Sequence, residues 1–295
     1  MLDQAYSRRQ FLGLAGGLAS FVGLGLVGCG GAGASNAADK GSAAAESVSG
    51  EVTYDGASSF QALVEAAAEK FMDANPDVSV SGSGNGSGKG LTAVAAGTVT
   101  IGNSDVFAET KLEADQVKNL VDHEVAVVGM GPVVSKNVKV DDLSLEQLKG
   151  IFSGQITNWK EVGGDDGEIV LVGREAGSGT RDGFESIVDV KDSCKYAQEL
   201  TATGAVISAV EANPLAIGYA SLSAVGDTVA MVTVEGVECS EDTVKDGSYK
   251  IQRPFVFVTN KSVTLSEQAQ AFVDFATSKD AADLIRTAGA VPVNE

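Results

Sequence analysis

The sequence predicts an α/β protein with mainly parallel sheets. Strand-like and helix-like segments alternate along most of the 295 residues, which is the pattern of repeated β-α-β units. Hydrophobic residues make up 44% and charged residues 21% of the chain, as in soluble globular proteins, and the length is sufficient to bury a sizeable core. The 36 glycines favour a protein rich in loops.

A helix at 60–76 has the clearest pattern in the first half of the chain. Its apolar residues recur at alternating intervals of three and one and form one stripe, which consists of Phe60, Leu63, Val64, Ala67, Ala68, Phe71 and Met72. Asn75 and Pro76 end this helix. Around it we predict a strand running into a loop at 50–58, a strand at 78–84, a helix at 90–97 and a strand with its loop at 98–105.

The second half of the chain continues the alternation. We predict a pair of apolar strands at 123–135, a helix at 144–152, a strand and loop at 168–180, helices at 181–188 and 203–214, a strand and turn at 216–224, a strand at 253–260 and two helices at 266–277 and 278–290. Parallel strands joined by helices place their ligands at the carboxyl ends of the strands, so the loops at those ends are the first place to look for a site.

The first residues have the pattern of an export signal. The twin-arginine stretch SRRQFL, at 7–12, is followed by an apolar run that ends in LVGC at Cys29. We favour a signal peptide at 1–28, cleaved before a lipidated Cys29, over an uncleaved membrane anchor of the same length. Residues 29–50 have almost no large apolar side chains and predict a flexible, lipidated tether.

The charge and the rare residue types exclude several function classes. A formal net charge of −19 argues against binding to nucleic acid or to anionic lipid headgroups. The single histidine, His123, argues against a Ser-His-Asp triad and a multi-histidine zinc site, and we expect no metal and no cofactor. Outside the cytoplasm Cys194 and Cys239 could form a disulfide, or they could be two separate buried thiols.

Four loops at predicted strand ends share a composition of glycine and small polar residues, at 56–60, 84–90, 102–105 and 174–180. None fits a phosphate-binding P-loop, a dinucleotide fingerprint or a nucleophile elbow. Each hydroxyl could be an ordinary helix N-cap. Alternatively, the loops together offer hydroxyls, first-turn N–H groups and the guanidinium of Arg174, which suit a tetrahedral oxyanion. Four such loops, one of them with an arginine, favour a shared anion site.

Longer motifs give the chain a specific resemblance. The segments GSGKGLTAVAAGTVTIGNSD, REAGSGTRDGFE, LSLEQLKGIFSGQITNWKEVGG and NPLAIGYASLSAV are similar to motifs of the phosphate-binding proteins of bacterial ABC phosphate importers, which are type II periplasmic solute-binding proteins. The resemblance covers about residues 51–295. It implies two lobes joined by two hinge strands that cross near 132–135 and 253–256. Lobe 1 would contain 51–132 and 255–295, and lobe 2 would contain 133–254.

The resemblance also implies a function and a set of ligand contacts. The protein would be a monomeric, lipid-anchored receptor on the extracytoplasmic face of the cell membrane, without enzymatic activity, that delivers inorganic phosphate to the transmembrane subunits of an ABC permease. The phosphate-binding residues would be Ser59, Phe60 through its N–H, Ser87, Asp105, Arg174, Ser178, Gly179 and Thr180. Ser58 and Ser104 flank them and are further candidates.

Two features of the loops raise questions of chemistry. Ala176 stands where the family often has an acidic residue two positions after the arginine, so Glu175 or Asp182 is expected to hold Arg174 instead. Asp105 could be a simple turn residue. Alternatively, its carboxylate accepts a hydrogen bond from the proton that hydrogen phosphate keeps at neutral pH and repels sulfate, which has none.

Three other functions remain compatible with parts of the sequence. The same fold could bind another oxyanion or act as a sensor. An extracytoplasmic phosphoester hydrolase would need a nucleophile with a base or a metal cluster, which the four loops do not offer. A purely structural surface lipoprotein would not account for the four donor loops.

Overall fold

A computed structural model describes residues 48–295. The predicted signal at 1–28, the lipidated Cys29 and most of the tether at 29–50 therefore lie outside the described residues. Within 48–295, no helix combines the length and the apolar character that a membrane crossing requires.

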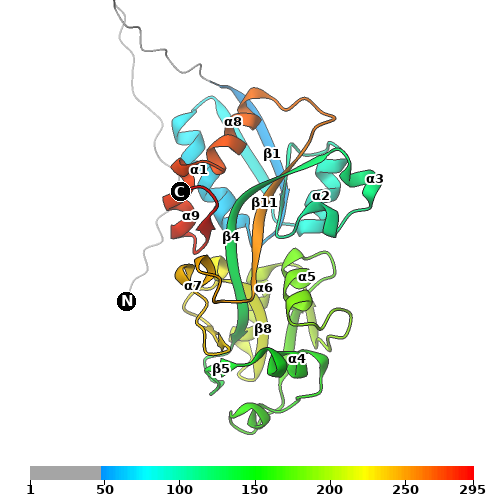
Figure 1. Cartoon of the computed structure of the whole chain (residues 1–295), viewed down its shortest axis with the longest axis vertical. Helices are drawn as coiled ribbons and strands as arrows, with labels where there is room; N and C mark the ends of the chain where they lie inside the picture. The colour runs from blue at the N-terminus through cyan, green and yellow to red at the C-terminus, as the bar shows by residue number, and fades with distance from the viewer. Residues whose placement is uncertain (1–47) are drawn as a thin grey trace, which may run out of the picture. The chain divides into compact units, whose positions relative to one another are not determined.

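The described residues form an α/β fold (Figure 1). The strands are β1 Gly50–Gly56, β2 Val78–Ser83, β3 Ile101–Ser104, β4 Leu120–Val134, β5 Asp142–Leu143, β6 Val170–Arg174, β7 Gln198–Leu200, β8 Ala216–Ser221, β9 Ala230–Met231, β10 Thr233–Val234, β11 Gln252–Asn260 and β12 Val291–Pro292. The α-helices are α1 Gln61–Ala74, α2 Ser87–Ala95, α3 Ala114–Val117, α4 Leu145–Ser153, α5 Gly179–Ile187, α6 Thr203–Ala212, α7 Glu241–Lys245, α8 Glu267–Ala276 and α9 Ala282–Thr287. Short 3₁₀ turns are η1 Ala108–Thr110, η2 Trp159–Val162, η3 Leu222–Ala224 and η4 Lys279–Ala281.

The main sheet has the strand order β2-β1-β3-β11-β4-β8-β6-β7. Pairing is parallel at both ends of this order, where β1 lies between β2 and β3 and β6 lies between β7 and β8. It is antiparallel in the middle, where β11 and β4 pair with each other and with their outer neighbours β3 and β8. The predicted α/β class is confirmed, and the sheet is mixed because two long central strands run against the parallel sets.

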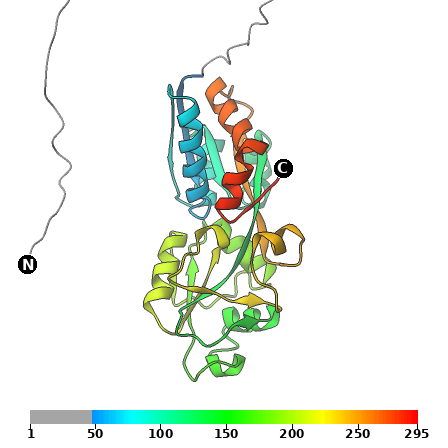
Figure 2. The same ribbon diagram turned by 90° about the vertical axis from the view of Figure 1, so that its left-hand side faces the viewer.

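The apolar stripe of the predicted first helix becomes a core face. Helix α1 ends at Ala74, before Asn75 and Pro76 as expected, and five of its stripe residues are fully buried: Leu63, Val64, Ala67, Ala68 and Phe71. They pack with buried residues of α8 and α9. Figure 2 shows the ribbon of α1 beside the helices of the C-terminal part of the chain. Phe60, just before the helix, stacks on Phe255 with ring centroids 4.3 Å apart.

The predicted pair of strands at 123–135 is wrong, because residues 123–134 belong to the single strand β4, which ends at Val134. The glycines of this segment do not interrupt the strand, and they serve close packing. A Cβ on Gly129 would overlap Cys239, and one on Gly131 would overlap the Tyr249 hydroxyl. The glycines thus let α7 and Tyr249 lie directly on a continuous strand.

Strands β4 and β11 pair and run side by side (Figure 1). Two large clusters of buried side chains follow one another along these strands. Along β4 the change from one cluster to the other occurs between Val128 and Met130, and on the returning chain it occurs between Ile251 and Phe255. On β4 the change comes slightly before the crossing expected at 132–135. The lobe boundaries themselves stay a prediction.

Cys194 and Cys239 are free thiols, so the disulfide alternative is wrong for this structure. They pack against different elements: Cys194 contacts the Val190 carbonyl after α5, whereas Cys239 lies beside Gly129 of β4. Burial raises the pKa of both thiols to about 12. Both are therefore uncharged and unreactive at neutral pH.

Gly90 gives a test of the packing between α2 and β1. A Cβ at this position would overlap the backbone of Asp55 and Gly56, neither of which can move aside cheaply. We expect Gly90→Ala to lower the free energy of unfolding by about 1–3 kcal/mol, measured by urea denaturation. The matched control is Gly204→Ala in α6, where a Cβ has open space. It should be neutral or stabilising by up to about 1 kcal/mol, and equal losses in both variants would contradict the packing.

Candidate functional site

The four glycine-rich loops come together at the carboxyl ends of parallel strands. Ser59 follows β1, Ser87 begins α2 after β2, Asp105 follows β3, and Arg174 ends β6 just before α5. The predicted site residues Ser59, Ser87, Asp105, Arg174, Ser178 and Thr180 are each at most 3% exposed. The convergence of Ser59, Ser87 and Asp105 follows from β-α-β topology, since β1, β2 and β3 are parallel strands that end at the same edge. Arg174, Ser178 and Thr180 come from the second parallel set, which β11 and β4 join to the first.

The Asp105 carboxylate is the centre of this cluster. It accepts hydrogen bonds from the Ser59 hydroxyl at 2.6 and 2.8 Å and from the Thr180 hydroxyl at 2.8 Å. Its backbone N–H donates to the Ser87 hydroxyl at 3.1 Å. Three loops and the first turn of α5 are thereby connected through the side chain and the backbone N–H of one residue. Asp105 is thus a buried acceptor of hydrogen bonds from other loops and has more than the local role of a turn residue.

Arg253 forms an ion pair with Asp105 and was missed as a site residue by the sequence analysis. It is 4% exposed, it donates to the Thr180 hydroxyl at 3.2 Å, and its guanidinium lies over the Phe255 ring at 5.3 Å from the centroid. The sequence did contain a signal, because an arginine begins the apolar strand RPFVFVTN. From the sequence, this stretch is predicted as a strand and a hinge crossing, without a role in the site.

The register of the sheet explains why Arg253 reaches Asp105. Strand β11 runs antiparallel to β3 with Val256 opposite Ser104. The residues that precede Val256 therefore continue past the end of β3, where the chain turns at Asp105. A contact between residues so far apart in sequence depends on β11 returning between β3 and β4.

Arg174 is held differently from the expectation. Its guanidinium donates to the carbonyls of Leu200 at 3.1 Å and Thr201 at 2.9 Å, and to the Thr203 hydroxyl at 2.8 Å. Burial lowers the pKa of Arg174, and the nearby Asp105 carboxylate acts in the opposite direction.

The prediction that Glu175 or Asp182 holds Arg174 is wrong. Asp182 forms an ion pair with Lys111, and Glu175 lies 4.0 Å from the ammonium of Lys89. Both carboxylates therefore pair with lysines of the facing segments and not with the guanidinium. Neutral oxygens at the end of β7 and the start of α6 take the place of an acidic partner.

The segments on the two sides of the site are in direct contact. The Gly88 N–H donates to the Gly177 carbonyl at 3.1 Å, and Lys111 donates to the Ala176 carbonyl at 2.9 Å. A Cβ on Gly179 would approach the Ser87 hydroxyl to 2.5 Å. Glycine at 179 thus permits the start of α5 to lie against α2 and Asp105.

The remaining predicted site residues have local roles as well. Ser178 is the N-cap of α5 and its hydroxyl accepts a hydrogen bond from the Arg181 N–H at 3.2 Å. This hydroxyl is therefore a helix cap, the first of the two roles considered for the loop hydroxyls. The Ser104 hydroxyl bonds within its own turn to Val106, and the Phe60 N–H donates to the Ala57 carbonyl. Ser58 is directed toward Thr203 across the site.

This arrangement suits binding of a small anion better than catalysis. Hydroxyl donors, the first turns of α2 and α5 and two buried guanidiniums surround a single carboxylate. His123, the one histidine, lies on β4 with its Nε2 2.8 Å from the Thr259 hydroxyl, and burial lowers its pKa. It contacts none of the Asp105 cluster residues named above. Within 48–295, no group of acidic, histidine and cysteine side chains is arranged to hold a metal.

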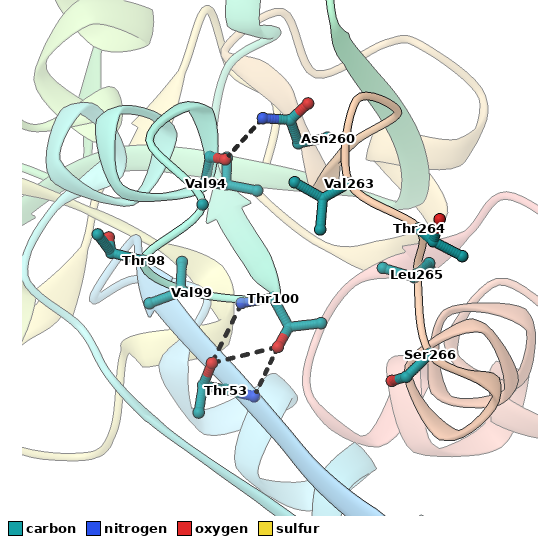
Figure 3. A pocket seen from close by; sticks show the side chains of 11 residues that line it. Thr53, Val94, Thr98, Val99, Thr100, Asn260, Val263, Thr264, Leu265 and Ser266 are labelled. Carbon is teal, nitrogen blue, oxygen red and sulfur yellow. Dashed lines mark hydrogen bonds between the residues drawn. The ribbon is translucent and has the colours of Figure 1, made fainter.

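A separate pocket of about 220 Å³ lies between the end of α2 and the segment that joins β11 to α8 (Figure 3). Hydroxyl and apolar side chains and the amide of Asn260 line it, and Thr53 and Thr100 bond to each other across its base. It contains no charged side chain and no residue of the Asp105 cluster, so it is distinct from the candidate site.

Comparisons with known proteins agree with this geometry. The family model of the PBP superfamily domain matches residues 41–280. The phosphate-binding protein PstS of Bacillus subtilis (strain 168) is 40% identical over 275 residues, which cover 90% of this chain and 89% of that protein. A crystal structure of a proposed phosphate ABC transporter substrate-binding protein from Clostridium perfringens, with bound phosphate, has a TM-score of 0.75 and 36% identity over 83% of this chain and all of that one. An ABC-type phosphate transport receptor from Vibrio cholerae has a TM-score of 0.66 and 30% identity over 81% of this chain and 99% of that one.

The Asp105–Arg253 ion pair predicts a large effect on stability. Arg253→Met leaves a buried carboxylate without its cation, so we expect the free energy of unfolding to fall by about 3–5 kcal/mol in denaturant titrations. Arg286→Met is the control, because this partly exposed arginine also forms ion pairs but should contribute less than about 1 kcal/mol. Adding Asp105→Asn to Arg253→Met should recover part of the loss. Equal effects at 253 and 286 would show that the buried pair has no special role.

Proposed function

Since the chain belongs to the PBP superfamily and, within it, to the phosphate-binding proteins of ABC importers, we propose that it binds inorganic phosphate at the Asp105 cluster and supplies an ABC permease with it. The observation that carries the proposal is one carboxylate buried among hydroxyls and guanidiniums. A site for any oxyanion needs only donors. A buried acceptor among the donors is suited to an oxyanion that carries a proton.

The chemistry of the carboxylate favours phosphate over sulfate. Phosphate monoesters lose their second proton with a pKa of about 6. Inorganic phosphate has one more acidic oxygen than a monoester, so it still carries at least one proton near neutral pH. Asp105 can accept a hydrogen bond from that proton. Sulfate has no proton to donate. Its negatively charged oxygens would face the Asp105 carboxylate, which would be left without a hydrogen-bond partner.

The other predicted ligands supply donors. Ser59 and Thr180 now donate to Asp105, and the Thr180 hydroxyl lies 3.2 Å from the Ser59 hydroxyl, so binding would exchange these bonds for bonds to the anion. The N–H groups of Gly179 and Thr180 lie in the first turn of α5, where a helix has no acceptors for them. The Ser87 hydroxyl and the remaining N–H groups of Arg174 complete the set.

We further propose that phosphate binds between two lobes that close by a hinge motion at β4 and β11. Two features support it: separate buried clusters lie along successive parts of β4 and of the chain at β11, and bonds such as Gly88 to Gly177 join the loops of the two sides. The protein would act as a monomer, with both walls of the site on one chain.

The location of the receptor is part of the proposal. The twin-arginine stretch and the LVGC ending support export followed by lipidation of Cys29, which would hold the domain at the extracytoplasmic face of the cell membrane. The tether would then let it move between capture and delivery to the permease.

Calorimetric titration of the protein with phosphate and with sulfate tests the binding proposal. We expect phosphate to bind at least about 100-fold more tightly than sulfate, because a buried charged acceptor without a partner costs several kcal/mol. Asp105→Asn should reduce this ratio by at least about tenfold. Asp122→Asn, which changes a carboxylate on β4 outside the site, should leave it unchanged. Absence of phosphate binding would refute the proposal, and equal affinity for the two anions would indicate a general oxyanion receptor or sensor.

Membrane attachment is tested at the cysteine of the LVGC ending. In a bacterial host that processes lipoproteins, we expect the protein in the membrane fraction and Cys29→Ser in the soluble extracytoplasmic fraction. Mass spectrometry of the N-terminal peptide should show a lipid on Cys29. Cys194→Ser is the control and should remain with the membrane. If Cys29→Ser also stays there after cleavage of the signal, another feature attaches the protein.

A further inference from the structure

The way in which Arg174 is held has consequences for binding. Its side chain donates three hydrogen bonds, all to neutral oxygens, two of them backbone carbonyls and one the Thr203 hydroxyl. Within 48–295 it forms no salt bridge, although it is only 1% exposed. A guanidinium has five N–H groups, so two remain after these three bonds.

The charges in the cluster therefore do not balance. Arg253 forms an ion pair with Asp105. Arg174 is held by neutral oxygens and, within 48–295, has no carboxylate in an ion pair with it. A buried cation without a counter-charge is costly, and an anion bound beside it offsets that cost. Because residue 176 is an alanine and not an acidic residue, the charge of Arg174 remains available to a ligand.

Thr203 connects this arginine to the facing side of the site. Its hydroxyl accepts from Arg174 at 2.8 Å and lies 3.4 Å from the Ser58 hydroxyl, which also accepts from the Thr203 N–H at 3.2 Å. Thr203 is 1% exposed and is the first residue of α6. The orientation of Arg174 is thereby coupled to the loop after β1, which also carries Ser59.

We propose that Thr203 is a positioning residue for phosphate binding: its hydroxyl fixes the Arg174 guanidinium against the anion and links it to Ser58 when the two sides of the site meet. The proposal rests on the proposed function, since the anion it concerns is phosphate. It assigns to α6 a part in the site that none of the four glycine-rich loops suggested.

The test is calorimetric titration of the full protein and its variants with phosphate. Thr203→Val keeps the shape of the side chain but removes the hydroxyl, and we expect it to weaken phosphate binding by about tenfold, the size of one hydrogen bond to a charged group. Thr203→Ser keeps the hydroxyl and should restore binding to within about threefold of the original protein. The matched control is Thr201→Val, because the exposed Thr201 holds Arg174 only through its carbonyl. It should stay within about twofold.

A double-mutant cycle distinguishes positioning from a general structural effect. If Thr203 acts through Arg174, then Thr203→Val should change phosphate affinity by less than about twofold in an Arg174→Gln background. Persistence of the full tenfold effect there, or equal effects of Thr203→Val and Thr201→Val, would overturn the proposal. If Thr203→Val does not fold, Ser58→Ala serves instead: it removes the link across the site, and unchanged affinity would count against the coupling.

The two proposals fail in different ways. If the original protein does not bind phosphate, the proposed function is refuted and this inference falls with it. If the original protein binds phosphate and Thr203→Val binds it equally well, only the role of Thr203 is refuted.

Discussion

The buried ion pair between Asp105 and Arg253 is the interaction on which the arrangement of the site depends. Asp105 is 1% exposed and carries a charge that the interior can hold only if cations and hydroxyls surround it. Arg253, Ser59 and Thr180 meet this requirement from three separate elements. The loop after β1, the turn after β3, the start of α5 and strand β11 are therefore tied to one carboxylate.

The two central strands make this arrangement possible. Strands β4 and β11 pair antiparallel over most of their length and lie between the two parallel sets. Each parallel set brings its own loops to the site. Strand β11, which belongs to neither set, adds Arg253, the partner of Asp105. A site formed from both sets and from a connecting strand is sensitive to how the sets are oriented, which is the property that a closing receptor needs.

A strongly acidic protein can still bind an anion, because the recognition is local. The formal net charge of −19 is a property of the whole chain, whereas the site presents two guanidiniums, hydroxyls and helix starts around one carboxylate. At physiological ionic strength charges beyond about 8 Å are largely screened when exposed to solvent. The surface charge should slow the approach of an anion in a salt-dependent way without deciding the affinity.

The sequence by itself determined the features that depend on neighbouring residues. The apolar stripe predicted α1 and its end at Asn75, and the glycine-rich loops predicted which hydroxyls lie at strand ends, because periodicity and helix starts are local properties. The motifs also identified the family. Only the tertiary structure decided that β4 is one strand, that the two cysteines stay apart, and that Arg253 and Thr203 join the site. Those contacts link residues from distant parts of the chain, and their partners are fixed by the return of β11 between β3 and β4 and by the packing of α6, which no local pattern encodes.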